Sequence, residues 1–352
     1  MIDRSSKAIG NWLLVGVFML VIQIALGGIT RLTGSGLSIT EWDVITGSVP
    51  PLNEHDWVIE FQKYQQTPQY KLLNSDFDLQ NFKFIFFWEW FHRFWARLIG
   101  IVFAIGFVYF ILTKKFKKEM VNPMIILFLL GALQGAIGWI MVASGLTGDA
   151  VYVKPTRLAL HFIFAMLLIS YTFWFAMKLL VNESDRTVQP KLRNFTWAII
   201  ALIAVQLIYG ALMAGHKAAT AAPTWPDING HFLPPNSFAE NPVSVNFIDN
   251  KQLIHFIHRN LAYLLLLLTA LWFLRAKKVA EGLFKKKYAL PLILITVQIL
   301  LGIFTVLNSL KIVPGKWGNF EWLAQIHQLV GMLLLLSFVY MLFLLTGKRR
   351  IA

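Results

Sequence analysis

The sequence predicts an all-α integral membrane protein with eight transmembrane helices, arranged as two pseudo-symmetric four-helix bundles. Of its 352 residues, 57% are apolar and 14% are charged, and the mean hydropathy is +0.60. This composition is typical of chains whose segments lie in lipid. The chain also contains eight apolar windows and an internal repeat that relates the first four windows to the last four. Such a repeat indicates two structurally similar units.

The eight apolar windows define the predicted helices. Each is long enough to cross most of a hydrocarbon layer of about 30 Å, because a helix rises about 1.5 Å per residue. We expect the first helix to be retained, since the stretch before it lacks the cleavage site of a signal peptide. The windows span residues 12–30, 84–112, 123–143, 158–180, 195–215, 253–274, 289–309 and 322–345.

Basic residues collect on one side of the predicted membrane. The stretches 1–11, 113–122, 178–193, 275–288 and 346–352 hold 19 Lys or Arg, whereas the alternate stretches hold 9. The positive-inside rule therefore predicts cytoplasmic termini and extracytoplasmic long loops. The net charge of +14 is explained by this topology, and we expect no nucleic-acid partner.

The internal repeat is marked by a glutamine followed four residues later by a glycine, in predicted helices 1, 3, 5 and 7. A small residue one turn from an amide suits close helix packing and an interhelical hydrogen bond. Trp42 and Trp225 follow two of these glutamines at equal distances. We therefore predict two domains, residues 1–180 with the loop 31–80 and residues 194–346 with the loop 216–251. The four motifs are Gln23/Gly27, Gln134/Gly138, Gln206/Gly210 and Gln298/Gly302.

Four histidines share the repeat. His92 and His161 are 69 positions apart, and His258 and His327 repeat this spacing 166 positions later. Counted from the cytoplasmic ends of the predicted helices, all four lie at a depth of about 24 to 30 Å, near the outer edge of the membrane. The chain has no cysteine, which excludes thiolate ligands and leaves histidine as the obvious ligand of haem iron. The pattern predicts two haem sites, although a single transmembrane histidine can also serve only in helix packing.

The residues before the histidines distinguish the two pairs. Glu89 lies three positions before His92, whereas His255 lies three positions before His258. Residues three apart share a helix face, so Glu89 is a candidate for proton transfer or charge stabilisation beside the first haem site. An ion pair with Arg93 or Arg97 is the alternative. We interpret His255 as a packing residue or as a residue that supports a ligand.

Three arginines accompany the predicted ligands at the outer membrane edge. Arg93 and Arg259 directly follow His92 and His258, and Arg157 lies one turn before His161. Guanidinium groups at this position suit haem propionates. Extension of the side chains toward the aqueous interface is the competing explanation.

With these motifs the chain resembles the haem A synthase family of mitochondria and Gram-negative bacteria. The resemblance covers nearly the whole length. Some family members carry a cysteine pair in an extracytoplasmic loop, and this chain lacks it. The most specific stretches are GGITRLTGSGLSITEW (27–42), WEWFHRFWARLIG (88–100), RLALH (157–161), FIHR (256–259) and QIHQ (325–328).

The resemblance implies an enzyme that oxidises the C8 methyl group of haem O to a formyl group by successive hydroxylations, giving haem A for terminal oxidases. It assigns His258 and His327 to one resident haem b, so that His92, His161 and Glu89 form the substrate side. It also implies the inner membrane of a bacterium as the location and haem O synthase and a redox partner as partners besides membrane lipid. A homo-oligomeric state stays open.

Two other classes of function remain. A dihaem b-type electron carrier would use the same four histidines but usually places its haems near opposite membrane faces, whereas the depths predicted here are equal. A haem transporter or chaperone needs an open path and exchangeable ligands, on which the sequence is silent.

Overall fold

The computed structural model describes residues 3–41, 49–313 and 316–347, so Trp42 lies outside the described residues. Within these ranges, eight helical spans are long and apolar enough to cross a membrane. Each overlaps most of one of the eight predicted windows, which confirms the all-α membrane fold. The long helices are α1 (Arg4–Leu32), α4 (Leu79–Leu112), α5 (Lys118–Ala143), α6 (Pro155–Leu180), α7 (Pro190–Gly215), α9 (Lys251–Val279), α11 (Leu290–Leu307) and α12 (Asn319–Leu344).

Most helices extend beyond the apolar windows that predicted them. Helix α1 begins eight residues before its window, because the Asp3 side chain caps it by accepting a hydrogen bond from the Ser6 amide at 3.0 Å. Lys117, just before α5, donates to the same carboxylate at 2.6 Å, and together these donors hold the pKa of Asp3 well below its usual range. Charged residues therefore end the apolar windows without ending the helices.

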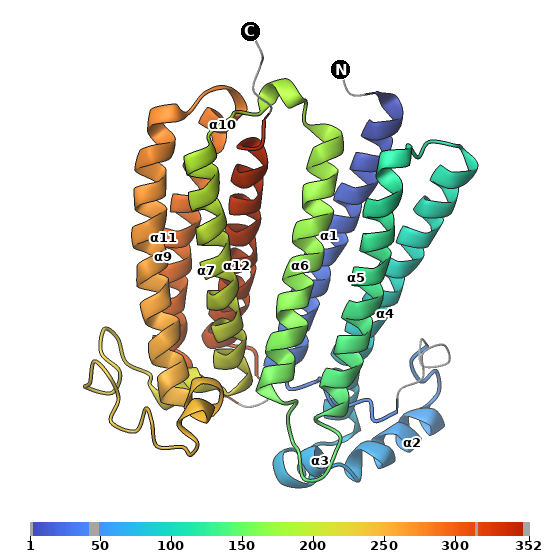
Figure 1. The fold of residues 1–352 in the computed structure, drawn as a ribbon. Coiled ribbons are helices and arrows are strands. Elements are labelled where there is room, and N and C mark those ends of the chain that lie inside the picture. The colour runs from blue at the N-terminus through green and yellow to red at the C-terminus, as the bar shows by residue number, and fades with distance from the viewer. Residues whose placement is uncertain (1–2, 42–48, 314–315, 348–352) are drawn as a thin grey trace.

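The helices gather in two groups (Figure 1). We call α1, α4, α5 and α6 the first half, and α7, α9, α11 and α12 the second half. Helices α1 and α6 contact α7 and α12 across the boundary. The first turn of α1 and the last turn of α12 lie at one end of the molecule, and the long connections lie at the other end, as the charge pattern predicts. The division into two domains stays a prediction.

The apolar core fills the end of the molecule near the chain termini. It joins both halves through large buried side chains such as Phe175, Trp272 and Phe338. The indole of Trp272 donates to the Thr196 hydroxyl at 2.8 Å, which satisfies its polar atom. The space for a ligand runs alongside this core, from residues of the long connections such as Gly34 and Trp225 to Trp12 and Met124 near the end where the termini lie.

The first long connection is a folded cap on α4. Its helices α2 (Glu54–Gln65) and α3 (Pro68–Leu73) pack through Tyr64 against Phe82 and Phe86 of α4. The buried Tyr64 hydroxyl accepts a hydrogen bond from Asn74 at 2.7 Å, and burial raises its pKa to about 12. These contacts hold the cap over the end of the first half that lies opposite the chain termini.

Candidate functional site

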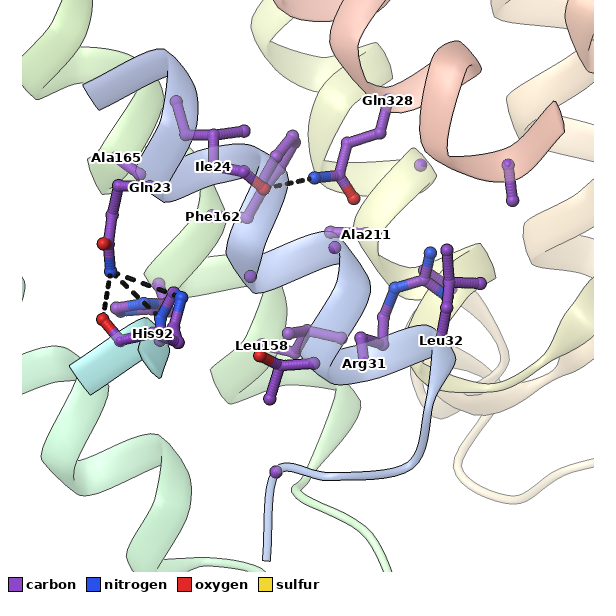
Figure 2. A pocket seen from close by; sticks show the side chains of 18 of the residues that line it. Gln23, Ile24, Arg31, Leu32, His92, Leu158, Phe162, Ala165, Ala211 and Gln328 are labelled. Atoms are coloured by element: carbon purple, nitrogen blue, oxygen red, sulfur yellow. Dashed lines mark hydrogen bonds between the residues drawn. The ribbon is translucent and has the colours of Figure 1, made fainter. Parts of the chain in front are cut away.

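Each of the four predicted histidine ligands lies against a glutamine and a glycine of a neighbouring helix. In the first half, the Gln23 amide nitrogen of α1 lies 3.2 Å from the His92 carbonyl oxygen and 3.2 Å from the imidazole Nε2. A Cβ atom at Gly27 would lie 3.1 Å from His92 Cε1. The glutamine therefore holds the histidine, and the missing side chain of the glycine makes room for its ring (Figure 2).

The same arrangement recurs three times. The glutamine amide nitrogen lies 3.4, 3.5 and 3.3 Å from the imidazole Nε2 of His161, His258 and His327. A Cβ atom at the glycine would lie 2.9, 3.3 and 3.0 Å from Cε1 of the same rings. The four QxxxG motifs thus pair one to one with the four histidines, in the order Gln23/Gly27 with His92, Gln134/Gly138 with His161, Gln206/Gly210 with His258 and Gln298/Gly302 with His327.

The histidine sites contain buried acceptors without a donor. The side-chain oxygens of Gln23, Gln134, Gln206 and Gln298 are buried and have no hydrogen-bond partner among the described residues. A histidine that binds metal through one ring nitrogen donates the proton of its other ring nitrogen to a nearby acceptor. A turned amide would present its oxygen to the imidazole, and His327 Nδ1 lies 3.1 Å from the Gln298 backbone carbonyl. These acceptors fit histidines that ligate iron.

All four histidines line one cavity of about 1810 Å³ that extends through both halves. Typical small-molecule sites measure about 300 to 1,000 Å³, so this cavity has room for two large ligands. The rings of His258 and His327 are neighbours in an edge-to-face arrangement, with centroids 6.4 Å apart and ring planes at 71°. This distance is long enough for two metal–nitrogen bonds of about 2 Å each, together with the length from each ring centroid to its ring nitrogen. Among the described ring contacts this close pairing does not recur between His92 and His161.

The four histidines lie at similar depth. Each is 17 to 21 residues from the last residue of its helix at the end where the chain termini lie. At about 1.5 Å per residue this corresponds to about 26 to 32 Å. The prediction of one common depth agrees with the observed helices.

Glu89 connects α4 to the loop that follows α1. It is only 3% exposed and lines the cavity. Its Oε2 accepts hydrogen bonds from the Ser38 amide at 2.7 Å, the Ser38 hydroxyl at 2.8 Å and the Ile39 amide at 3.0 Å. Its Oε1 pairs with Arg93 Nη2 at 2.5 Å. The ion pair considered as an alternative is therefore present, and Ser38 is a contact that the sequence did not reveal.

The three predicted arginines all bond to the protein. Arg93 Nη2 donates to the Glu89 carboxylate and also lies 3.5 Å from the Ile39 carbonyl oxygen. Arg157 donates to the Ile140 carbonyl at 3.0 Å. Arg259 donates to the loop carbonyls of Thr224 at 2.5 Å and Asp227 at 2.6 Å. Arg93 and Arg259 each hold the long loop of their own half. Their role toward propionates stays a prediction.

His255 occupies in the second half the place of Glu89 in the first. It is 1% exposed, and its Nε2 accepts a hydrogen bond from Arg259 Nε at 3.1 Å. It thus supports the arginine that holds the loop, and its role toward a ligand stays a prediction. The carboxylate at this position is confined to the first half.

Comparison with known proteins agrees with this arrangement. The family COX15-CtaA, described as "Cytochrome oxidase assembly protein", matches residues 10–339. The chain is 41% identical over 318 residues to a Heme A synthase of Paracoccus denitrificans, which covers 88% of this chain and 84% of that protein. It is 39% identical over 344 residues to a Heme A synthase of Flavobacterium psychrophilum, covering 96% and 98% of the two chains. The chain therefore belongs to the COX15-CtaA family of cytochrome oxidase assembly proteins.

Proposed function

We propose that this chain is a haem A synthase, an oxidoreductase that converts the C8 methyl group of haem O to the formyl group of haem A. Its membership of the family and the names of its relatives support the activity. The observation that carries it is a large cavity lined by two pairs of held histidines, with the carboxylate of Glu89 three residues before His92 and a histidine, His255, at the corresponding position before His258.

In this proposal His258 and His327 hold one resident haem b. The distance of 6.4 Å between their ring centroids leaves room for an iron atom between them. When bound, haem b supplies one-electron transfer, which no protein side chain performs as readily. His92 and His161 bind and orient haem O in the first half. Their glutamines fix the rings in place, and their glycines let α4 and α6 approach α1 and α5.

Glu89 contributes a fixed negative charge at the substrate side. Its ion pair with Arg93 and its three bonds from the loop hold the carboxylate in one position on the cavity wall. A carboxylate at this position stabilises positive charge that develops on the substrate, or accepts a proton through the less occupied Oε1.

The location that fits this activity is the inner membrane of a bacterium. The charge pattern supports cytoplasmic termini and four histidines that lie toward the extracytoplasmic side. A haem O synthase and a redox partner would supply substrate and take up electrons. Whether two copies of the chain associate stays open.

One observation favours a second candidate, a dihaem b-type electron carrier. The four histidine sites are built alike, as two equivalent haems would require. The common depth of the histidines opposes it, because transmembrane electron transfer needs haems near both faces. The two functions differ in the pigments that the protein holds.

The experiment that tests the enzyme is the substitution Glu89→Gln. Glutamine keeps the size of the side chain but removes its charge, so we expect normal haem b content and at least about a hundredfold loss of haem A formation, the lower end of the contribution of a positioned acid–base group. Glu321→Gln is the matched control, since Glu321 is a second buried acid on the cavity wall and its carboxylate accepts from the Gly318 amide at the start of α12. A normal yield of haem A from the Glu89 variant would contradict the assigned role.

A further inference from the structure

The cavity has an excess of positive charge. Six basic and three acidic side chains line it: Arg31, Arg93, Arg97, Lys217, Arg259 and Lys316 against Asp76, Glu89 and Glu321. Glu89 is paired with Arg93, and Glu321 accepts a backbone hydrogen bond. An excess of this sign in a largely apolar space favours an anionic ligand.

Arg31 differs from the three arginines that the sequence singled out. Arg93, Arg157 and Arg259 all donate to protein carbonyls or to Glu89. The Arg31 guanidinium has no hydrogen bond or ion pair to any residue in the described part of the chain, yet it lines the cavity. Figure 2 shows it near the end of α1, with no interaction drawn to it. A guanidinium held away from bulk water without a partner is costly, so its partner is expected to be a ligand.

The position of Arg31 relates it to the histidine sites. It lies four residues after Gly27, the glycine that makes room for His92, and therefore on nearly the same face of α1. Four residues of helix correspond to about 6 Å, which places Arg31 about one turn beyond the histidines toward the outer end of the membrane. The polar edge of a porphyrin held by these histidines would point toward that end, because its hydrocarbon edge belongs in the apolar interior.

We propose that Arg31 binds a propionate carboxylate of a porphyrin in this cavity. A planar guanidinium matches a carboxylate with two parallel hydrogen bonds, and the cavity walls shield the pair from water. The inference rests on the proposed haem binding, and the same chemistry applies to haem b and to haem O. Arg31 is in this account a binding residue for the ligand's acid group and takes no part in holding the iron.

The test compares haem b with its dimethyl ester, in which both propionates are neutral. The full-length chain, purified from haem-depleted cells, is titrated with each compound, and binding is followed by the absorption band of the haem. We expect the unmodified chain to bind haem b at least about tenfold more tightly than the ester, as a charge-assisted hydrogen bond predicts. Equal affinities would overturn the proposal without any substitution.

The variant Arg31→Gln should bind both compounds with nearly equal affinity, whereas Arg31→Lys should keep part of the difference. Arg275→Gln is the control and should keep all of it, because Arg275 packs over the Phe195 ring and is not among the residues that line the cavity. An undiminished preference for haem b in Arg31→Gln would overturn the proposal.

Repeating the titration in the His92→Ala and His327→Ala backgrounds shows which of the two porphyrins Arg31 contacts. The preference for haem b over its ester that depends on Arg31 should persist in one background and disappear in the other. Persistence of the full effect in both would contradict a contact to a porphyrin held by either pair. Failure of the unmodified chain to bind any haem would instead contradict the proposed function itself.

Discussion

Gln328 of α12 donates a hydrogen bond to the carbonyl oxygen of Ile24 in α1, at 2.9 Å, across the boundary between the two halves (Figure 2). One turn earlier, Gln325 donates to the Ala25 carbonyl at 3.0 Å. Gln328 directly follows the predicted ligand His327, and Ile24 directly follows Gln23, which holds His92. The two amides therefore fix one histidine of each half at a set position relative to the other.

Removal of this bond should loosen the contact between the halves. Interhelical hydrogen bonds in membranes contribute about 0.6 kcal/mol on average and up to about 1.7, so we expect Gln328→Leu to lower the free energy of unfolding by about 1 kcal/mol. Thermal unfolding in detergent measures the change. Thr296→Val is the control, because the exposed Thr296 hydroxyl donates only to its own helix at Leu292. Equal stability of the two variants would contradict a bridging role.

The glycine of each motif should be irreplaceable. In Gly138→Ala the new Cβ atom would lie 2.9 Å from His161 Cε1, so either the ring or α5 must move, and we expect loss of binding at the first site. Gly135→Ala, one turn away on the same helix, meets no atom within 4 Å and should be neutral. Spectra of the bound pigment report the outcome. Normal occupancy in Gly138→Ala would show that the site tolerates the displacement.

Each glutamine should affect haem binding only in its own half of the molecule. Gln298→Leu removes the amide that lies 3.3 Å from His327 Nε2, and we expect weaker haem binding in the second half with an unchanged first half. Gln23→Leu should show the reverse. The loss should be about 1 kcal/mol or roughly fivefold in affinity, as for a typical hydrogen bond. Identical spectral effects of the two substitutions would argue against two separate sites.

The loop contact to Glu89 should support turnover. Ser38→Ala removes one of the three loop donors on Glu89 Oε2 and leaves the two backbone amides. We expect the rate of haem A formation to fall by about tenfold to a hundredfold, since one hydrogen bond to a charged group is worth about 1.5 to 3 kcal/mol and about 1.4 kcal/mol corresponds to a factor of ten. Ser237→Ala is the control, because that buried hydroxyl lies in the other loop and donates to Pro234. A rate unchanged by Ser38→Ala would exclude this support.

The sequence was sufficient to predict the fold and to single out the four histidines that line the cavity. Long apolar windows leave helices as the only option in lipid, and the repeat ties His92 and His161 to His258 and His327. The pairing of each histidine with a QxxxG motif was not predictable in the same way. It depends on which helices are neighbours, and spacing along the chain does not contain that information.

The polar contacts of the loops were also beyond the sequence. Ser38 lies 51 residues before Glu89, and no local pattern links the two. Similarly, Arg93 and Arg259 look free for a ligand in the sequence, because their carbonyl partners lie in irregular loop segments. Arg31 was overlooked for the opposite reason: it ends an apolar helix, where a basic residue ordinarily marks the membrane interface.

The identity of the bound pigments tests the central claim most directly. The protein should be purified from cells that make haem O, and its pigments should be extracted and identified by mass and by reduced-minus-oxidised spectra. We predict haem b together with haem O, a hydroxylated intermediate or haem A, and loss of the oxidised forms in Glu89→Gln. Two equivalents of haem b, with no haem O and no oxidised product, would contradict the enzyme and identify an electron carrier.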